Sequence, residues 1–126
     1  MSLDSGSAKP SESLRGDIWD IDLGPTKGSE IQKLRPCVII SSDSINQNSN
    51  VRLVVPLTEW KPSRDNYHWF VPIEPSAQNG LTKKSGANVL QTRCVSIERF
   101  HVKKGIISAE DIAEIAAALA AVIEYE

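Results

Sequence analysis

The pattern of apolar and polar residues predicts a chain built mainly from short β-strands. Residues 18–23 alternate imperfectly between apolar and acidic side chains, as a strand with one face in water does. Residues 36–41 form a continuous apolar run with β-branched residues at its centre, which is typical of a strand buried on both faces. Residues 51–58 predict a further strand, in which Pro56 indicates an edge or a bulge.

The second half of the chain predicts three more strands and one helix. The strands are expected over 69–73, 87–95 and 101–107, and the proline in the first of them again indicates an edge. After Ser108, which resembles an N-cap followed by acidic residues, apolar residues recur at helical spacing to the end of the chain. The pattern therefore predicts a mainly β fold with a C-terminal α-helix, in a small closed or nearly closed barrel.

Composition divides the chain into a short tail and one domain. Residues 1–13 are polar and rich in Ser, Lys and Pro, and we expect them to be a disordered tail. Residues 14–126 are expected to form a single domain. Because no apolar run approaches the ~20 residues of a membrane span and no signal pattern is present, we expect a cytoplasmic protein without a membrane partner. Cys37 and Cys94 lie in apolar strand segments, which predicts two buried thiols.

Charge and metal-binding residue types restrict the function. The formal net charge is −2, which argues against a general nucleic-acid coat. The basic residues are nevertheless concentrated in the middle of the chain and the acidic ones in the last helix and at the ends, which leaves room for an anion on one face. His68 and His101 have no partner at metal-ligand spacing, so we expect no metal site and no cofactor.

Two pairs of polar residues stand where a ligand could meet the sheet. Arg35 ends a Gly- and Lys-bearing loop immediately before a buried strand, and its planar guanidinium suits a phosphate. Thr58 ends a strand near the same rim. Gln91 and Arg93 would share one face of the strand predicted over 87–95. Each also has an interpretation without a function. Arg35 could be an ordinary exposed arginine and Thr58 an ordinary threonine at a strand end. Gln91 and Arg93 could lie on a solvent-exposed face of the sheet.

A set of spaced motifs is more specific than any of these residues alone. They are Arg-Gly-Asp-Ile-Trp at 15–19, Arg-Pro-Cys-Val-Ile-Ile-Ser at 35–41, Pro-Leu-Thr at 56–58 and Gln-Thr-Arg-Cys at 91–94. On these residues the sequence resembles the MazF/PemK toxins of type II toxin–antitoxin systems, over nearly the whole chain from Arg15 onward. The resemblance implies an SH3-like small β-barrel of the CcdB/PemK type. It also implies a homodimer with an RNA channel along its interface and a cognate antitoxin with an acidic disordered segment.

The resemblance also implies a reaction and assigns roles to residues. The reaction is metal-independent cleavage of single-stranded RNA, in which a ribose 2′-hydroxyl attacks the adjacent phosphate and leaves a 2′,3′-cyclic phosphate and a 5′-hydroxyl. By motif, Arg35 stabilises the developing charge and can serve as the acid, and Thr58 offers its hydroxyl to a phosphate oxygen. The residues expected to line the channel and contact RNA are Ser29, Glu30, Gln91 and Arg93. Leu90 stands where some relatives carry an acid and Cys94 where they carry threonine, so the general base stays open, with Glu30 as a candidate.

Two alternative functions share the same barrel. A protein-targeted toxin similar to the CcdB gyrase poisons would need no Arg35/Thr58 pair, and the Arg-Pro and Pro-Leu-Thr motifs favour the nuclease. A non-catalytic adaptor would bind RNA or a partner without cleaving it. The presence of Arg35 and Thr58 weighs against the adaptor, whereas Leu90 keeps it open.

Overall fold

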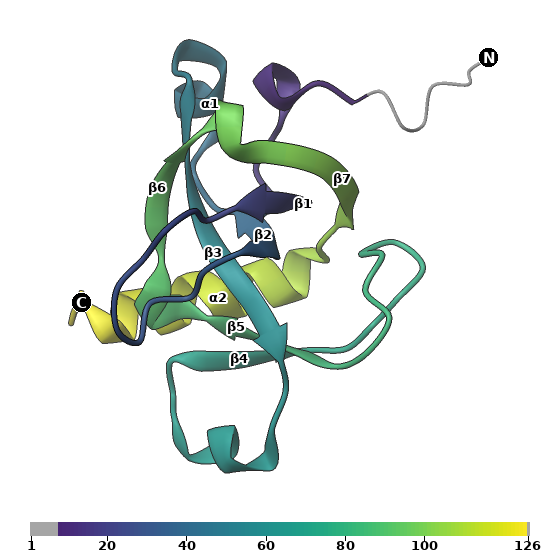
Figure 1. Cartoon of the computed structure of the whole chain (residues 1–126). Coiled ribbons are helices and arrows are strands. Elements are labelled where there is room, and N and C mark those ends of the chain that lie inside the picture. The colour runs from purple at the N-terminus through teal and green to yellow at the C-terminus, as the bar shows by residue number, and fades with distance from the viewer. Residues whose placement is uncertain (1–7, 126) are drawn as a thin grey trace.

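The computed structural model describes residues 8–125, and its strands build one curled, barrel-like sheet (Figure 1). The order of the seven-stranded antiparallel sheet is β4-β5-β3-β2-β1-β7, and β6 pairs with β3 beside β5. The strands are β1 (Asp17–Asp22), β2 (Leu34–Ile39), β3 (Val51–Glu59), β4 (Phe70–Ile73), β5 (Ser85–Asn88), β6 (Arg93–Ser96) and β7 (Phe100–Ile106). The helices are α1 (Asp43–Asn48) and α2 (Ala109–Val122), with 3-10 turns η2 (Pro10–Glu12), η3 (Pro62–Asn66), η4 (Val89–Gln91) and η5 (Ile97–Arg99). The predicted mainly β fold with a C-terminal helix is confirmed.

Of the three prolines that lie in strands, Pro56 and Pro72 occupy positions that need no complete set of backbone hydrogen bonds. Strand β4, which contains Pro72, is an edge strand of the sheet, as its proline indicated. Strand β3 is instead central, so an edge position for Pro56 is wrong. On one side of β3, however, pairing with β6 ends at Val54 and pairing with β5 begins at Leu57. Pro56 lies in this gap, where fewer backbone donors are required.

The single strand predicted over 87–95 is wrong. The chain forms β5, then the 3-10 turn η4, then β6. β5 pairs with Leu57–Glu59 and β6 with Val51–Val54, so two separate stretches of β3 are covered by consecutive segments of chain. The turn η4 connects β5 to β6. It is closed by Thr92, whose backbone N–H and hydroxyl both donate to the carbonyl of Val89. Gln91 consequently belongs to a turn and not to a strand face.

Hydrophobic side chains pack on both faces of the sheet. Along β2, alternation sends Val38 into one cluster and Cys37 into the other. The first cluster is covered by α2, whose Ile115 is fully buried in it, and Figure 1 shows this helix running across the sheet. The N-cap prediction is confirmed, because Ser108 Oγ accepts from the backbone N–H of Asp111 at 3.0 Å. No described helix has the length and apolar character needed to cross a membrane.

The described part of the predicted tail has defined structure. Residues 1–7 of the predicted tail lie outside the described residues, but 10–12 form η2 and Ser13 is only 1% exposed. The cause is Arg52, a buried side chain whose Nε donates to Ser13 Oγ at 3.0 Å and whose Nη2 donates to the Ser11 carbonyl at 3.1 Å. A buried guanidinium needs hydrogen-bond partners, and this segment supplies them. The expectation of disorder is therefore wrong for the described part of the tail.

The two thiols occupy different environments. Cys37 is fully buried, as predicted, and burial raises the pKa of its thiol to about 12, with the nearby charge of Asp20 acting in the same direction. Cys94 is exposed, which corrects the prediction of a second buried thiol. On β6 the neighbouring Val95 fills the inward position, so alternation turns Cys94 outward.

Candidate functional site

The sheet register brings the predicted pair Arg35 and Thr58 together. Strands β2 and β3 pair Cys37 with Pro56, and extending this register by two residues places Arg35 opposite Thr58. On its other side Arg35 pairs with Ile21 of β1. Because side chains alternate along each strand, both residues point to the face of the second hydrophobic cluster, which contains Cys37 and Ile21.

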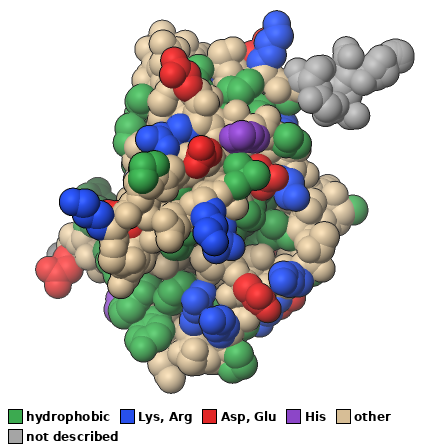
Figure 2. Space-filling model, viewed as in Figure 1, with side chains coloured by type: hydrophobic (Ala, Val, Ile, Leu, Met, Phe, Trp, Pro, Cys, Tyr) green, Lys and Arg blue, Asp and Glu red, His purple; other side chains and the backbone are tan. Residues whose placement is uncertain are grey.

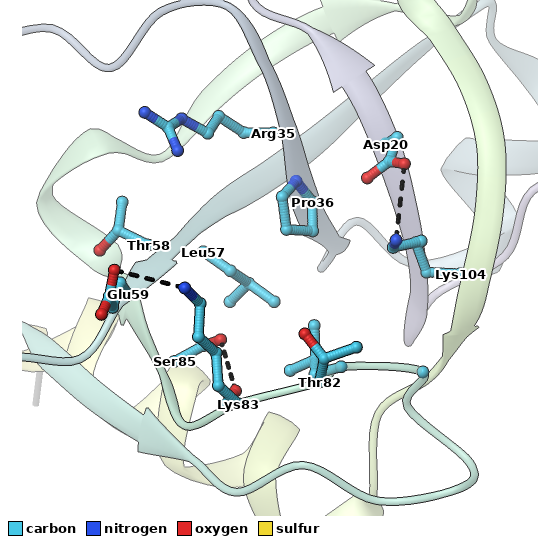
Figure 3. Close-up of a pocket in the computed structure, with 12 residues that line it drawn as sticks. Asp20, Arg35, Pro36, Leu57, Thr58, Glu59, Thr82, Lys83, Ser85 and Lys104 are labelled. Atoms are coloured by element: carbon cyan, nitrogen blue, oxygen red, sulfur yellow. Dashed lines mark hydrogen bonds and ion pairs between the residues drawn. The ribbon is translucent and has the colours of Figure 1, made fainter.

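Both residues line one cavity of about 220 Å³, where β2 begins and β3 ends. Figure 3 shows Arg35 and Thr58 on one side of it and Asp20 with Lys104 on the other. Its lining residues come from β1, β2, β3, β5, β7 and the loop before β5, and they are Asp20, Arg35, Pro36, Leu57, Thr58, Glu59, Gly80, Leu81, Thr82, Lys83, Ser85 and Lys104. We call this the Arg35 cavity.

Of the three cations that line the Arg35 cavity, Arg35 has no counter-ion among residues 8–125. Lys104 Nζ lies 3.8 Å from a carboxylate oxygen of Asp20, and Lys83 Nζ lies 3.5 Å from one of Glu59. The exposed side chain of Arg35 makes no hydrogen bond or ion pair with any residue that the structure describes. Its guanidinium is thus a free, planar set of donors at the rim of a cavity, which is the arrangement that suits a phosphate.

One wall of the cavity depends on a close backbone approach between the loop before β5 and strand β7. Gly80 has a φ of +71°, and a Cβ at this position would lie 2.1 Å from the backbone oxygen of Lys104. Close by, the backbone N–H of Ile106 donates to the Gln78 carbonyl at 2.8 Å. Only glycine fits there, because a side chain at this position would overlap the backbone of β7. Sequence reasoning did not select Lys83 or Lys104 for this site, because only this long-range contact brings them to it.

The predicted RNA-contacting residues gather at a second cavity, of about 400 Å³. Glu30, Gln91 and Arg93 line it, and Ser29 lies beside it in the loop between β1 and β2. The full lining is Pro25, Thr26, Glu30, Leu90, Gln91, Thr92 and Arg93, and we call it the Arg93 cavity.

Polar side chains in the Arg93 cavity hold the β1–β2 loop in place. The amide of Gln91 donates to the Ser29 carbonyl at 2.7 Å and accepts from the Ile31 N–H at 2.8 Å. Arg93 Nη1 donates to the Leu23 carbonyl at 3.1 Å. Glu30 accepts from the backbone N–H of Lys27 at 2.7 Å, within the loop. The structure therefore brings these predicted residues together and shows a structural role for each, including Ser29 through its backbone.

The two cavities lie on the same face of the sheet. Arg93 pairs with Val54 of β3, and Val54 belongs to the second hydrophobic cluster, on the face where Arg35 and Thr58 also lie. Thr58 is four residues further along β3, a separation of about 13 Å at ~3.3 Å per residue. Arg35 and Arg93 are therefore separate positive groups on the same face of the sheet.

Among residues 8–125, no group of three or more His, Cys, Asp or Glu side chains is arranged to hold a metal ion. His68 packs edge-on against Trp69, with ring centroids 5.2 Å apart. Trp19 is a core residue, whereas Trp60 and Trp69 are only partly buried.

An arginine without a counter-ion among the described residues lies beside a threonine at one cavity of a barrel-like sheet, which is the arrangement expected of a site for an anion. Residues 14–123 match the family model described as PemK-like, MazF-like toxin of type II toxin–antitoxin system. The chain belongs to this family, and the resemblance inferred from its motifs is confirmed.

Individual relatives agree in sequence and in fold. The chain is 32% identical over 110 residues to endoribonuclease MazF9 of Mycobacterium tuberculosis, covering 83% of this chain and 91% of that protein. It is 32% identical over 101 residues to endoribonuclease MazF of Staphylococcus saprophyticus, covering 80% and 82%. The crystal structure of MazF from Deinococcus radiodurans superposes with a TM-score of 0.74 at 17% identity, covering 89% of this chain and 96% of that one. An endoribonuclease in complex with its cognate antitoxin, from Mycobacterial species, gives 0.71 at 20% identity, covering 90% and 97%.

Proposed function

We propose that this protein is the toxin of a type II toxin–antitoxin pair and acts as an endoribonuclease on single-stranded RNA, inhibiting translation and growth. The observation that carries the proposal is the free guanidinium of Arg35 beside Thr58 at the rim of one cavity. Membership of the toxin family and the endoribonuclease relatives support it. The proposal implies the cytoplasm as the compartment, since its RNA substrate is there.

The proposed reaction needs no external nucleophile. The 2′-oxygen of a ribose attacks the adjacent phosphorus, the bond from phosphorus to the 5′-oxygen breaks, and a 2′,3′-cyclic phosphate and a 5′-hydroxyl result. Because the nucleophile is already held next to the phosphate, the protein has to supply proton transfer and charge stabilisation. Arg35 would stabilise the charge that develops on the phosphate oxygens and could protonate the leaving oxygen, and Thr58 would donate a hydrogen bond to one phosphate oxygen.

The proton acceptor is restricted by the position of the carboxylates. Glu30, the candidate from the sequence, lines the Arg93 cavity and uses one oxygen within its own loop. The carboxylates that line the Arg35 cavity are those of Asp20 and Glu59. Both are closer candidates for accepting the 2′-hydroxyl proton in a substrate bound at Arg35.

The RNA strand would run from the Arg35 cavity to the Arg93 cavity along one face of the sheet. Arg93 and the loop that carries Ser29 and Glu30, held by Gln91, would contact nucleotides next to the cleaved bond. Figure 2 shows Lys and Arg side chains gathered on the lower half of the viewed face, where β3, β4 and β5 lie in Figure 1. Positive charge there would attract the RNA backbone in a salt-dependent way.

The proposed partners follow from the family and from the charge of the site. A cognate antitoxin with an acidic disordered segment would place carboxylates where RNA phosphates otherwise bind, so the two should compete, more weakly at high salt. A homodimer is proposed as the active form. The exposed apolar side chains of Leu53, Ile123 and Tyr125, which line a further cavity of about 240 Å³, offer apolar area for such an association.

The proposal is tested by incubating the protein with a long single-stranded RNA in EDTA and mapping the fragment ends. Cleavage is expected to persist and to give 5′-hydroxyl and 2′,3′-cyclic phosphate ends, and Arg35→Ala should lower its rate by ~10²–10³. Activity that disappears with chelation and returns with magnesium would contradict the mechanism. RNA binding without cleavage would favour the adaptor, and inhibition of gyrase supercoiling without cleavage would favour a CcdB-like poison.

A further inference from the structure

An arginine that the sequence motifs do not include contacts the hydroxyl of Thr58. Arg64, in the turn η3 between β3 and β4, donates from Nη1 to Thr58 Oγ1 at 2.5 Å. The same nitrogen donates to the Glu59 carbonyl at 3.2 Å. The centre of the guanidinium lies 4.5 Å from the centroid of the Phe70 ring. Three contacts therefore fix the end of a long side chain that would otherwise be mobile.

The backbone of the loop presents Arg64 to β3. The turn is closed on both sides of this residue, because the Arg64 N–H donates to the Lys61 carbonyl at 2.9 Å and the Tyr67 N–H donates to the Arg64 carbonyl at 3.0 Å. Phe70 begins β4 and gives the planar guanidinium a face on which to stack. Stacking leaves the in-plane donors of Arg64 directed at their acceptors on β3.

The contact with Arg64 determines whether the Thr58 hydroxyl donates or accepts a hydrogen bond toward the substrate. A hydroxyl has one proton to donate and two lone pairs, whereas a guanidinium can only donate. Thr58 Oγ1 must therefore accept from Arg64, and its own proton is left for another acceptor. A hydrogen bond from a charged donor also polarises the hydroxyl and strengthens the bond that it donates in turn.

We infer that Arg64 is a positioning residue of this site, which fixes Thr58 as a hydrogen-bond donor toward the phosphate of the substrate. The inference rests on the proposed function, because it acts through the role of Thr58 in RNA cleavage. Arg64 lines neither the Arg35 cavity nor the Arg93 cavity, and its effect reaches the substrate through Oγ1 of Thr58. A loop-anchoring role would instead depend on its contacts with Glu59 and Phe70.

A double-mutant cycle separates the two roles. Arg64→Met keeps an unbranched apolar side chain over Phe70 and removes every hydrogen-bond donor. RNA cleavage by this variant is measured in the wild-type and the Thr58→Ala backgrounds. We expect Arg64→Met to lower kcat about tenfold in the wild-type background with KM almost unchanged. In the Thr58→Ala background the same change should cause no further loss, because the hydroxyl it acts on is absent.

Two further variants provide the control and the rescue. Lys61→Met removes a cation from the same loop without touching Thr58, and its kcat should equal that of the wild type. Arg64→Lys restores a charged hydrogen-bond donor, but it restores neither the stacking of a planar group on Phe70 nor the paired donors of a guanidinium. It should recover most of the lost kcat. Thermal unfolding of all variants shows whether the loop and the domain stay folded.

The outcomes distinguish failure of this inference from failure of the proposed function. Equal losses from Arg64→Met in both backgrounds, or wild-type kcat in Arg64→Met, would overturn the positioning role while RNA cleavage by the wild type still stands. Poor recovery by Arg64→Lys together with a lowered unfolding temperature would also overturn it, in favour of loop anchoring. A wild-type protein that cleaves no RNA would remove the proposed function and this inference with it.

Discussion

The two cavities, on the face of the sheet that carries the second hydrophobic cluster, differ in how many of their polar groups already bond to the protein. In the Arg35 cavity, the arginine makes no hydrogen bond or ion pair to the described residues, whereas both lysines that line it face carboxylates. In the Arg93 cavity, Gln91 uses both ends of its amide and Arg93 donates to a backbone carbonyl. Free donors can respond to charge that develops in a transition state, while engaged donors maintain the shape of a binding surface. The first cavity therefore suits chemistry and the second suits recognition.

The largest effect is expected for Arg35→Ala. Removing a donor that acts on charge developed only in the transition state typically lowers turnover by ~10²–10³. Because the side chain of Arg35 is exposed and makes no hydrogen bond or ion pair with the described residues, the variant should keep the unfolding temperature of the wild type and still bind RNA. Single-turnover cleavage, RNA binding and thermal unfolding are measured together. Turnover close to that of the wild type would remove the proposed distinction between the cavities.

Arg93→Ala should change binding more than turnover. The side chain is proposed to hold RNA equally in the ground and transition states, so its loss should raise KM about tenfold and leave kcat within a few-fold. The slope of log binding constant against log salt should become less steep by about one phosphate contact. Titrations at several salt concentrations test this. A loss confined to kcat would place Arg93 with Arg35 in the chemical step.

Gln91→Ala should loosen the β1–β2 loop. Two hydrogen bonds to residues about sixty positions earlier in the chain disappear, at a cost of about 1 kcal/mol in the free energy of unfolding. KM should rise a few-fold because Ser29 and Glu30 lose their fixed positions. Denaturant unfolding and hydrogen exchange at Ile31 measure the effect. An unchanged exchange rate at Ile31 would show that the loop is held by other contacts.

The smallest effect concerns the two thiols, which report whether the sheet between the cavities is closed. At pH 8 the buried Cys37, with its pKa raised to about 12, has almost no thiolate, whereas Cys94 is exposed. Iodoacetamide should therefore modify one thiol in the native protein, and peptide mapping should find it at Cys94. Cys37 should react only after unfolding. Reaction of Cys37 in the native state would mean that the sheet opens beside Arg35.

Local patterns in the sequence determined much of this protein. Alternation and β-branched residues predicted β1 to β3, and the helical spacing after Ser108 predicted α2, because each signal depends on neighbours along the chain. The motifs around Arg35 and Thr58 identified the family, and the register of β2 and β3 then brought both side chains to one cavity. These features follow from short-range periodicity and from residues fixed at the ends of strands.

Tertiary structure alone decided the rest, because it depended on which segments meet across long stretches of chain. The break between β5 and β6 exists because two parts of β3 need separate partners, which no local pattern records. Residues 10–13 are ordered because the buried Arg52 finds acceptors there, some forty residues earlier in the chain. Arg64 reaches Thr58 because Phe70 and the turn η3 direct it there. Periodicity determines secondary structure, whereas hydrogen-bond partners of buried or stacked polar groups are settled only once the sheet has closed.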